Sequence, residues 1–335
     1  MLVELLDSLA AQTWPMFEII LVDDGSTDDT ANLLTRWRGA HPTVDLTVLR
    51  QPNAGPAAAR NRGFELAQGE FIFFIDSDDL VCPAALTDLV LSLQQSGKPY
   101  CLGTILVTDI AGVAMIKQDN SRPRQDAANI LRSAWMTHAA LYRRETVTHA
   151  GAFNAALRIG EDSEFQWRVV AKCGLGQVIA TVVGLRREHG MGHLSVGRHD
   201  SQIYRDSIVA IQTFSGWLQD NLLATPELDR TLARRLTVTG LRLGYLGDHR
   251  AKAAAFAMAA SLPGAPPMTA LVAKWLGKIN SDAFFSPIKY VVWSYRQLRK
   301  LRFAIDWLTL PGLRRLSDEQ PDRSLSMRLA DARQR

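Results

Sequence analysis

Apolar residues in the first two hundred positions alternate between two kinds of segment. Short, nearly continuous apolar runs lie at 17–22, 45–50 and 71–76, as expected for strands that are covered on both faces. Helices are predicted before, between and after these runs, within 2–11, 31–37, 53–67 and 83–95. Strands that alternate with helices imply β-α-β units, so the pattern predicts an α/β fold with a mostly parallel central sheet and helices on both faces.

The pattern changes near residue 200. Amphipathic helices are expected within 201–223, 228–246 and 251–262, and a basic, aromatic stretch extends from 286 to 316. We therefore expect two parts. The first is an α/β domain over residues 1–200, and the second is a helical C-terminal region over residues 201–335.

Composition excludes several classes of protein. The chain has 335 residues, and its three cysteines are scattered, so they suggest neither a disulfide framework nor a structural zinc site. Together with the lack of a basic leader and of an apolar run of about 18 residues, this favours the cytoplasm. A formal charge of +4 is mild and indicates no nucleic acid partner.

Acidic residues follow two of the predicted strands directly. Asp23 and Asp24 end the first run, and Asp76, Asp78 and Asp79 end the third. In parallel sheets, ligands bind outside the carboxyl ends of the strands. Each cluster taken alone is also explained by a helix cap and solvated carboxylates. Closely spaced carboxylates repel each other, so two such clusters favour a cation between them, and D-x-D spacing suits a hard divalent ion.

Three motifs, in order, resemble glycosyltransferase family 2, whose members have the A-type nucleotide-sugar fold. They are VDDGSTDD, GPAAARNRGFELAQGE and FIFFIDSDD, and the resemblance covers about residues 1–200. It implies that Asp24 contacts the nucleotide base, with Asp23 beside it. It also implies that Asp78 lies at the ribose and metal side, that Asp79 holds Mn²⁺ or Mg²⁺, and that Asp76 completes D-x-D. Such an ion stabilises the departing diphosphate as a Lewis acid.

Further roles follow from the same resemblance. Asp162, in the segment GEDSEFQWR, matches the catalytic base that takes a proton from the acceptor hydroxyl, and the neighbouring Glu161 is the alternative. His189, after the last strand of the domain, is expected to reach the metal or the diphosphate, with His193 as the alternative. Arg60 is expected to add positive potential near the donor, although pairing with a nearby acid explains it equally well.

The resemblance implies an inverting glycosyltransferase. We expect it to move one sugar from a nucleotide donor, UDP-linked, onto a glycan or lipid-linked acceptor in polysaccharide or cell-envelope synthesis. Two alternatives stay open: a nucleotidyltransferase, and a relative without turnover that binds nucleotide or a protein partner. A nucleotidyltransferase usually needs a Gly-rich phosphate loop near its first strand, and that motif does not occur here.

Two further expectations concern the ends of the chain. Family members normally open with an apolar strand ending in P-x-Y-N, whereas this sequence starts at the helix that would follow it, so we expect codons upstream of Met1 to encode that strand. Near the other end, residues 284–316 interleave basic and aromatic side chains. Such a segment is typical of peripheral contact with an anionic membrane surface, here the inner face of the cell membrane, although a helix packed on the catalytic domain also explains it.

Overall fold

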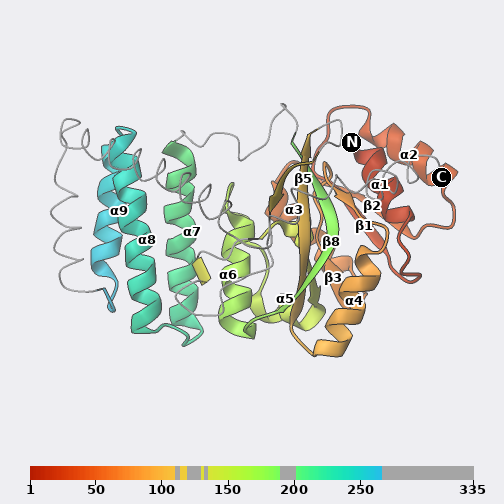
Figure 1. Cartoon of the computed structure of the whole chain (residues 1–335). Coiled ribbons are helices and arrows are strands. Elements are labelled where there is room, and N and C mark those ends of the chain that lie inside the picture. Colours follow the sequence, from red (N-terminus) through yellow and green to blue (C-terminus); the bar gives the residue numbers. More distant parts are fainter. Residues whose placement is uncertain (110–113, 119–129, 132–134, 189–200, 266–335) are drawn as a thin grey trace, which may run out of the picture. The chain divides into compact units, whose positions relative to one another are not determined.

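The computed structural model describes residues 1–109, 114–118, 130–131, 135–188 and 201–265 (Figure 1). The chain separates into two compact units, residues 1–278 and 279–335, and the second lies wholly outside the described residues. The predicted division at residue 200 falls inside the first unit and stays a prediction.

Helices and strands alternate through the first half of the chain (Figure 1). The strands are β1 (Ile19–Asp23), β2 (Leu46–Arg50), β3 (Phe71–Phe73), β4 (Leu80–Val81), β5 (Tyr100–Asp109), β6 (Ala114–Gln118), β7 (Ala140–Arg143) and β8 (Gln177–Glu188). The helices are α1 (Leu2–Ala10), α2 (Thr30–Ala40), α3 (Pro56–Leu66), α4 (Ala85–Ser96), α5 (Arg144–Ala150), α6 (Glu161–Cys173), α7 (Ser201–Asp220), α8 (Pro226–Tyr245) and α9 (His249–Ser261), with a short 3₁₀ helix, η2, at Thr137–Ala139.

The strands of the described residues form two sheets. In one, β1 pairs with β2 in parallel; in the other, the order is β3-β7-β5-β8-β4, with β6 paired to β5. The α/β class and the helical region after residue 200 are confirmed. Strand direction differs in part from the prediction: among the described residues, β1–β2 and β5–β8 are parallel, whereas the other four pairings are antiparallel. A buried strand is apolar whichever way its neighbour runs, so composition alone did not reveal the direction.

An aromatic cluster joins the larger sheet to α6. Phe165 of α6 stacks on Phe153 with ring centroids 4.1 Å apart, and Phe153 meets the edge of Phe74 at 5.0 Å. Tyr142 of β7 also packs against Phe165. Aromatic pairs of this kind contribute beyond their buried area, about 0.5–1.5 kcal/mol each. The cluster therefore holds the end of β3 at a defined place relative to the start of α6.

Helices α7, α8 and α9 follow one another in Figure 1, and they pack through buried apolar side chains. Gly240 of α8 allows a close approach, because a Cβ there would lie 3.0 Å from the ring of Phe256 on α9. Trp167 of α6 contacts Phe214 of α7, with centroids 5.7 Å apart. Among the described helices, none combines the length and the apolar character that crossing a membrane requires.

Candidate active site

Arg60 links two acidic segments that are far apart in sequence. From α3, its Nη2 donates to Oδ1 of Asp76 at 2.7 Å, and its Nη1 donates to Oε1 of Glu161 at 2.8 Å. Burial alone would lower the pKa of Arg60, but attraction and hydrogen bonds from the two carboxylates outweigh burial and raise it. The guanidinium is thus a permanent positive charge at the carboxyl end of β3. Both sequence interpretations of Arg60 are compatible with this position.

Asp162 lies beside this ion-pair cluster, in the first turn of α6. Burial and repulsion from Glu161 raise the pKa of Asp162 to about 6, against the opposing effects of a hydrogen bond from the Ser163 amide and the charge of Arg60. The Glu161 carboxylate is paired with Arg60, whereas the Asp162 carboxylate accepts a hydrogen bond from the backbone amide of the adjacent Ser163. The geometry therefore favours Asp162 over Glu161 as a proton acceptor near neutral pH.

The carboxylates of the D-x-D-D segment are held differently. Asp79 is 5% exposed; its Oδ1 accepts from the backbone N–H of Arg187 at 3.2 Å, and its Oδ2 lies 3.0 Å from Nδ1 of His138. Asp76 is more exposed, at 42% of its side chain, and Asp78 is half-buried. The Asp79 carboxylate thus faces the protein interior, while Asp76 and Asp78 lie at the surface of the strand end.

Three residues that the sequence did not single out for these contacts stabilise the D-x-D-D segment. Arg187 donates from Nε to the carbonyl of Asp78 at 2.6 Å, and its guanidinium also bonds Glu4 of α1. His138, on η2, is 1% exposed and packs so closely on β8 that a Cβ at Gly184 would lie 2.9 Å from its Cδ2. Arg187 lies two residues before His189, which the sequence did single out, whereas Glu4 and His138 belong to no recognisable motif.

In the first acidic pair, Asp23 and Asp24, the carboxylate of Asp24 binds the loop that contains residues 51–55. The Asp24 carboxylate accepts hydrogen bonds from the side chain of Gln51 and from the amides of Ala54 and Gly55, each at 2.8 Å. Asp23 is 6% exposed and accepts from the amide of Ser26. Both residues therefore lie at the carboxyl end of β1, where the sequence predicted them.

Two of the three predicted metal ligands, Asp78 and Asp79, belong to the described residues. His189 lies outside the described residues, so its predicted role is not tested. Within the described ranges, no three acidic, histidine or cysteine side chains converge as a metal site. The Asp76 and Asp78 carboxylates are nevertheless hard oxygen donors of the kind that Mg²⁺ and Mn²⁺ accept, and these ions usually take further ligands from substrate phosphates. The donor set therefore fits a divalent ion that binds together with a diphosphate.

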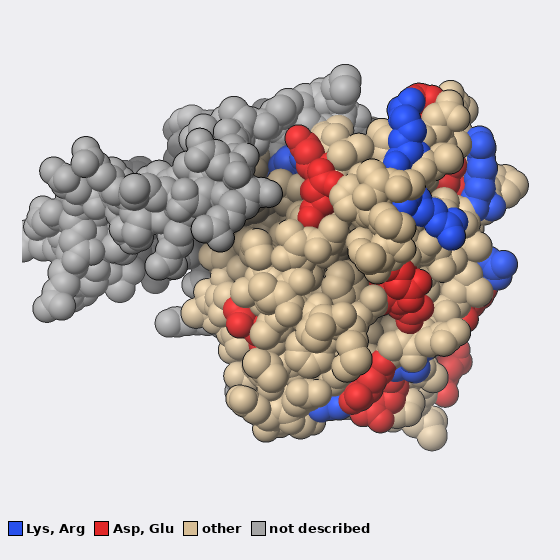
Figure 2. All heavy atoms as spheres, turned by 90° about the vertical axis from the view of Figure 1, so that its right-hand side faces the viewer, with Lys and Arg blue, Asp and Glu red and all other residues tan. Residues whose placement is uncertain are grey.

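On the described part of the face shown in Figure 2, neither the acidic nor the basic side chains form one continuous patch. Acidic and basic side chains occur in small groups, several of which adjoin one another, on a mostly uncharged surface. Among the described residues on this face, no extended basic stripe of the kind that binds nucleic acid is visible.

Comparison with known proteins assigns the domain that carries this acidic edge to the glycosyltransferases. Residues 1–159 match the model of Glycosyl transferase family 2, so this part of the chain is a domain of that family. The match ends just before Glu161 and Asp162.

Individual relatives agree with this family assignment. The chain is 42% identical over 103 residues to the uncharacterized glycosyltransferase YibD of Escherichia coli K12, covering 29% of each protein. It is 27% identical over 251 residues to the poly(ribitol-phosphate) beta-glucosyltransferase of Bacillus spizizenii, covering 72% of this chain and 37% of that protein. The chain thus spans about a third of the length of these two relatives.

A solved structure shares the fold. Residues 1–349 of Staphylococcus aureus TarS, in complex with UDP-GlcNAc, align with a TM-score of 0.53 at 19% identity, covering 82% of this chain and 85% of that one. This similarity confirms the A-type fold.

Proposed function

We propose that this protein is a metal-dependent inverting glycosyltransferase that transfers one sugar from a UDP-linked donor to a glycan or lipid-linked acceptor. The observation that carries the proposal is the Asp76–Arg60–Glu161 bridge. It places Asp162, a carboxylate with a pKa of about 6, next to the acidic strand end. A donor site and a general base at one edge are what a single displacement requires.

The proposed reaction uses Asp162 as the base. Its carboxylate accepts the proton of the acceptor hydroxyl while that oxygen attacks the anomeric carbon, and the bond from this carbon to the diphosphate oxygen breaks on the opposite face. Configuration at the anomeric carbon is therefore inverted. Arg60 keeps Glu161 and Asp76 in place through its two ion pairs, so that Glu161 does not compete for the proton.

The donor is proposed to bind at the carboxyl ends of β1 and β3. Asp23 and Asp24 face the nucleoside, while Asp76 and Asp78 face the ribose and diphosphate. Asp78 and His189 are proposed to hold the divalent ion, which supplies Lewis-acid stabilisation of the leaving diphosphate when bound. Asp79 was predicted to ligate the ion as well. Its inward contacts with His138 and Arg187 instead support a role in holding the D-x-D-D segment in shape.

The acceptor is proposed to be a cell-envelope polymer or its lipid-linked precursor. Support comes from relatives whose names state an action on poly(ribitol-phosphate). We further propose that the protein acts in the cytoplasm at the inner face of the membrane. The basic, aromatic residues 284–316, which favoured this location, lie outside the described residues.

Donor hydrolysis with and without Mn²⁺ tests the function. Wild-type chain and Asp162→Asn are incubated with UDP-glucose and UDP-GlcNAc, and released UDP is measured. The proposal expects Mn²⁺-dependent release from the wild type, and a change of anomeric configuration in any transfer product. Nucleotide binding without any UDP release would favour a relative without turnover. Release of pyrophosphate from UTP and a sugar phosphate would favour a nucleotidyltransferase.

A further inference from the structure

Asn61 of α3 binds the backbone of Phe153, in the segment that leads into α6. Nδ2 of Asn61 donates to the Phe153 carbonyl, and the Phe153 amide donates to Oδ1 of Asn61, each at 2.8 Å. The two bonds join residues that are 92 positions apart in sequence. Phe153 is 4% exposed, and buried backbone groups need such partners. Because both bonds come from one short side chain, they fix the orientation of this segment as well as its distance from α3.

The same segment is attached to α6 from the other side. Arg168 of α6 is buried and donates to the backbone carbonyls of residues 150–152. The carboxylate of Glu164, one turn earlier, accepts two hydrogen bonds from this guanidinium. The Phe153 ring also stacks on Phe165 of the same helix. The segment around Phe153 and helix α6 are therefore held together.

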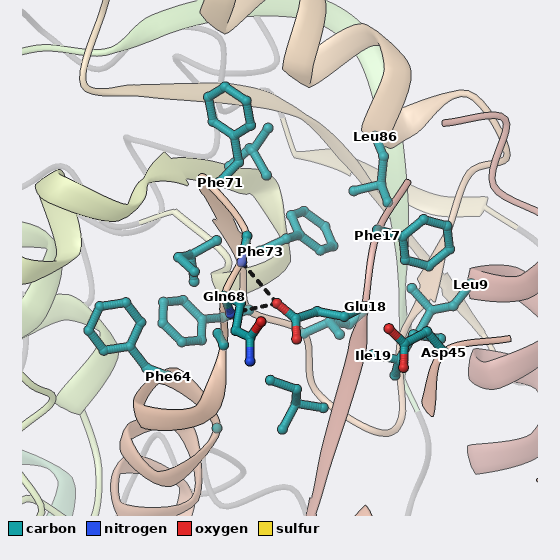
Figure 3. Close-up of a pocket in the computed structure, with 18 of the residues that line it drawn as sticks. Leu9, Phe17, Glu18, Ile19, Asp45, Phe64, Gln68, Phe71, Phe73 and Leu86 are labelled. Carbon is teal, nitrogen blue, oxygen red and sulfur yellow. Dashed lines mark hydrogen bonds between the residues drawn. The ribbon is translucent and has the colours of Figure 1, made fainter. Parts of the chain in front are cut away.

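Helix α3 is anchored independently at both of its ends. At the amino end, Asp24 accepts a hydrogen bond from the amide of Gly55. At the carboxyl end, Oε1 of Glu18 accepts from the amides of Gln68 and Gly69, at 2.6 and 2.9 Å (Figure 3). Both carboxylates flank β1, which begins one residue after Glu18 and ends one residue before Asp24. The position of α3 beside β1 therefore does not depend on Asn61.

Asn61 thus controls how α6 lies relative to α3. The preceding residue, Arg60, also reaches α6, through its ion pair with Glu161. An arginine side chain has several rotatable bonds and tolerates a range of separations. The short asparagine stem, with its paired bonds to Phe153, permits much less variation. Of these two contacts between α3 and the start of α6, the Asn61 contact is therefore the stricter.

The separation of α3 and α6 matters for the proposed chemistry. Asp162 lies in the first turn of α6, while the donor is proposed to bind at the strand ends beside α3. A general base must come within about 2.6–3.2 Å of the oxygen whose proton it takes. A misplacement of about 1 Å can lower a rate by about 10²-fold. A contact that fixes α6 on α3 therefore also fixes the base relative to the donor.

We propose that Asn61 is a positioning residue for the transfer reaction. Its contact with Phe153 sets the distance between α3 and the first turn of α6, and so holds the Asp162 carboxylate within reach of the attacking hydroxyl. This role rests on the proposed function, because it takes Asp162 as the base. It acts through the backbone of Phe153 and needs no contact between Asn61 and either substrate.

The test compares Asn61→Ala with Asn154→Ala. Asn154 follows Phe153 directly, but its side chain binds the Ala156 amide and Thr213 of α7 rather than α3. Both changes are neutral. They leave in place the charged groups that act on the Asp162 carboxylate, which are Glu161, Arg60 and Asp76. The two variants therefore differ in whether the link between α3 and α6 is lost.

The first readout separates kcat from donor binding. UDP release from UDP-glucose and UDP-GlcNAc is measured with Mn²⁺, with water in place of the acceptor, and rates are corrected for the folded fraction from circular dichroism. For Asn61→Ala we expect kcat to fall by about 10–100-fold. Its affinity for UDP, measured by calorimetry, should stay near that of the wild type because α3 keeps both anchors. Asn154→Ala should retain both values.

The second readout is the pKa of Asp162, followed by NMR of its carboxyl carbon and assigned by its absence from Asp162→Asn. In Asn61→Ala this pKa should move from about 6 toward 3.8 by about one unit, because a less confined carboxylate is better hydrated. Asn61→Ser, which is too short to meet both Phe153 groups, should change kcat and the pKa in the same directions. It replaces Asn61→Ala if that variant does not fold.

Two results would overturn the proposal. One is a wild-type kcat and Asp162 pKa in the folded Asn61 variants, as expected of a residue that only stabilises the fold. The other is an equal loss in Asn154→Ala. Failure of the proposed function looks different, because Asp162→Asn would then release UDP as fast as the wild type. The NMR titration does not require turnover, so it tests the role of Asn61 in either case.

Discussion

Nη1 of Arg60 lies 2.8 Å from Oε1 of Glu161, although 101 positions separate the two residues in sequence. Arg60 belongs to the segment GPAAARNRG, and Glu161 is the first residue of α6. Their ion pair therefore connects α3 to α6, the helix that carries Asp162.

Replacing Arg60 by methionine should destabilise the protein strongly. The change leaves the buried Glu161 carboxylate without its partner, and breaking a buried pair in this way typically costs about 3–5 kcal/mol. Arg62→Met on the same helix removes only an exposed pair with Glu65, worth about 0–1 kcal/mol, and is the matched control. Urea unfolding monitored by circular dichroism measures both free energies. Equal losses for the two variants would show that the Arg60 bridge is not a structural link.

Replacing Asp162 by asparagine should remove the general base while preserving donor binding. We expect kcat to fall by about 10²–10⁴-fold, with the affinity for UDP unchanged by calorimetry. In the wild type the base must be deprotonated, so kcat should rise with pH up to about 6, the pKa of Asp162, and level off above it. A variant that loses UDP affinity but keeps kcat would contradict this role.

The same substitution should stabilise the protein at neutral pH. Folding raises the pKa of Asp162 from its ordinary value near 3.8 to about 6, so the folded state binds a proton more tightly than the unfolded state. The charged carboxylate therefore costs stability above pH 6, on the order of 1–3 kcal/mol at 1.36 kcal/mol per pKa unit. Asp162→Asn should gain this amount at pH 7.5, and the gain should shrink as pH falls from 6 to 4. A gain that does not vary with pH would point to a cause other than ionisation.

Replacement by asparagine should affect UDP binding and stability differently at Asp78 and at Asp79. Asp78→Asn should weaken Mn²⁺-dependent UDP binding and leave the free energy of unfolding almost unchanged. Asp79→Asn should lower both, because its buried carboxylate meets His138 and the Arg187 amide; we expect a loss of about 1–3 kcal/mol. Calorimetry with UDP and Mn²⁺, together with urea unfolding, separates the two. A contrary result would be that Asp79→Asn abolishes Mn²⁺-dependent UDP binding without lowering the free energy of unfolding. That result would favour the role of metal ligand that the sequence predicts for Asp79.

Gly184→Ala should disturb the D-x-D-D segment through His138. An added Cβ would lie 2.9 Å from both the His138 ring and the Leu80 carbonyl, and overpacking of this kind costs about 1–3 kcal/mol. Gly216→Ala, on α7 in open space, should instead stabilise by about 0.5–1 kcal/mol because alanine favours helix. Thermal unfolding of both variants measures the contrast. A Gly184→Ala protein as stable as wild type would show that this packing can relax.

The strand ends illustrate what could be read from the sequence. Runs such as 17–22 and 71–76 are apolar because their side chains are buried or half-buried in the strands, and Asp23 and Asp76 stand at the carboxyl ends of these runs. These are local properties, so the alternation of strands and helices and the position of the acidic edge followed from residue order. Most family motifs fall in the same short segments, which is why they were recognisable.

Only the tertiary structure decided how these parts meet. The pairing of Arg60 with Glu161, the inward orientation of Asp79 toward His138, and the antiparallel direction of β3 against β7 all join residues distant in sequence. The sequence by itself determined the strands, the helices and the acidic residues that end the strands. The tertiary structure determined which carboxylates are neutralised, which are buried and how the strands pair, because pKa values and ladder pairing depend on neighbours that only long-range packing brings within a few ångströms.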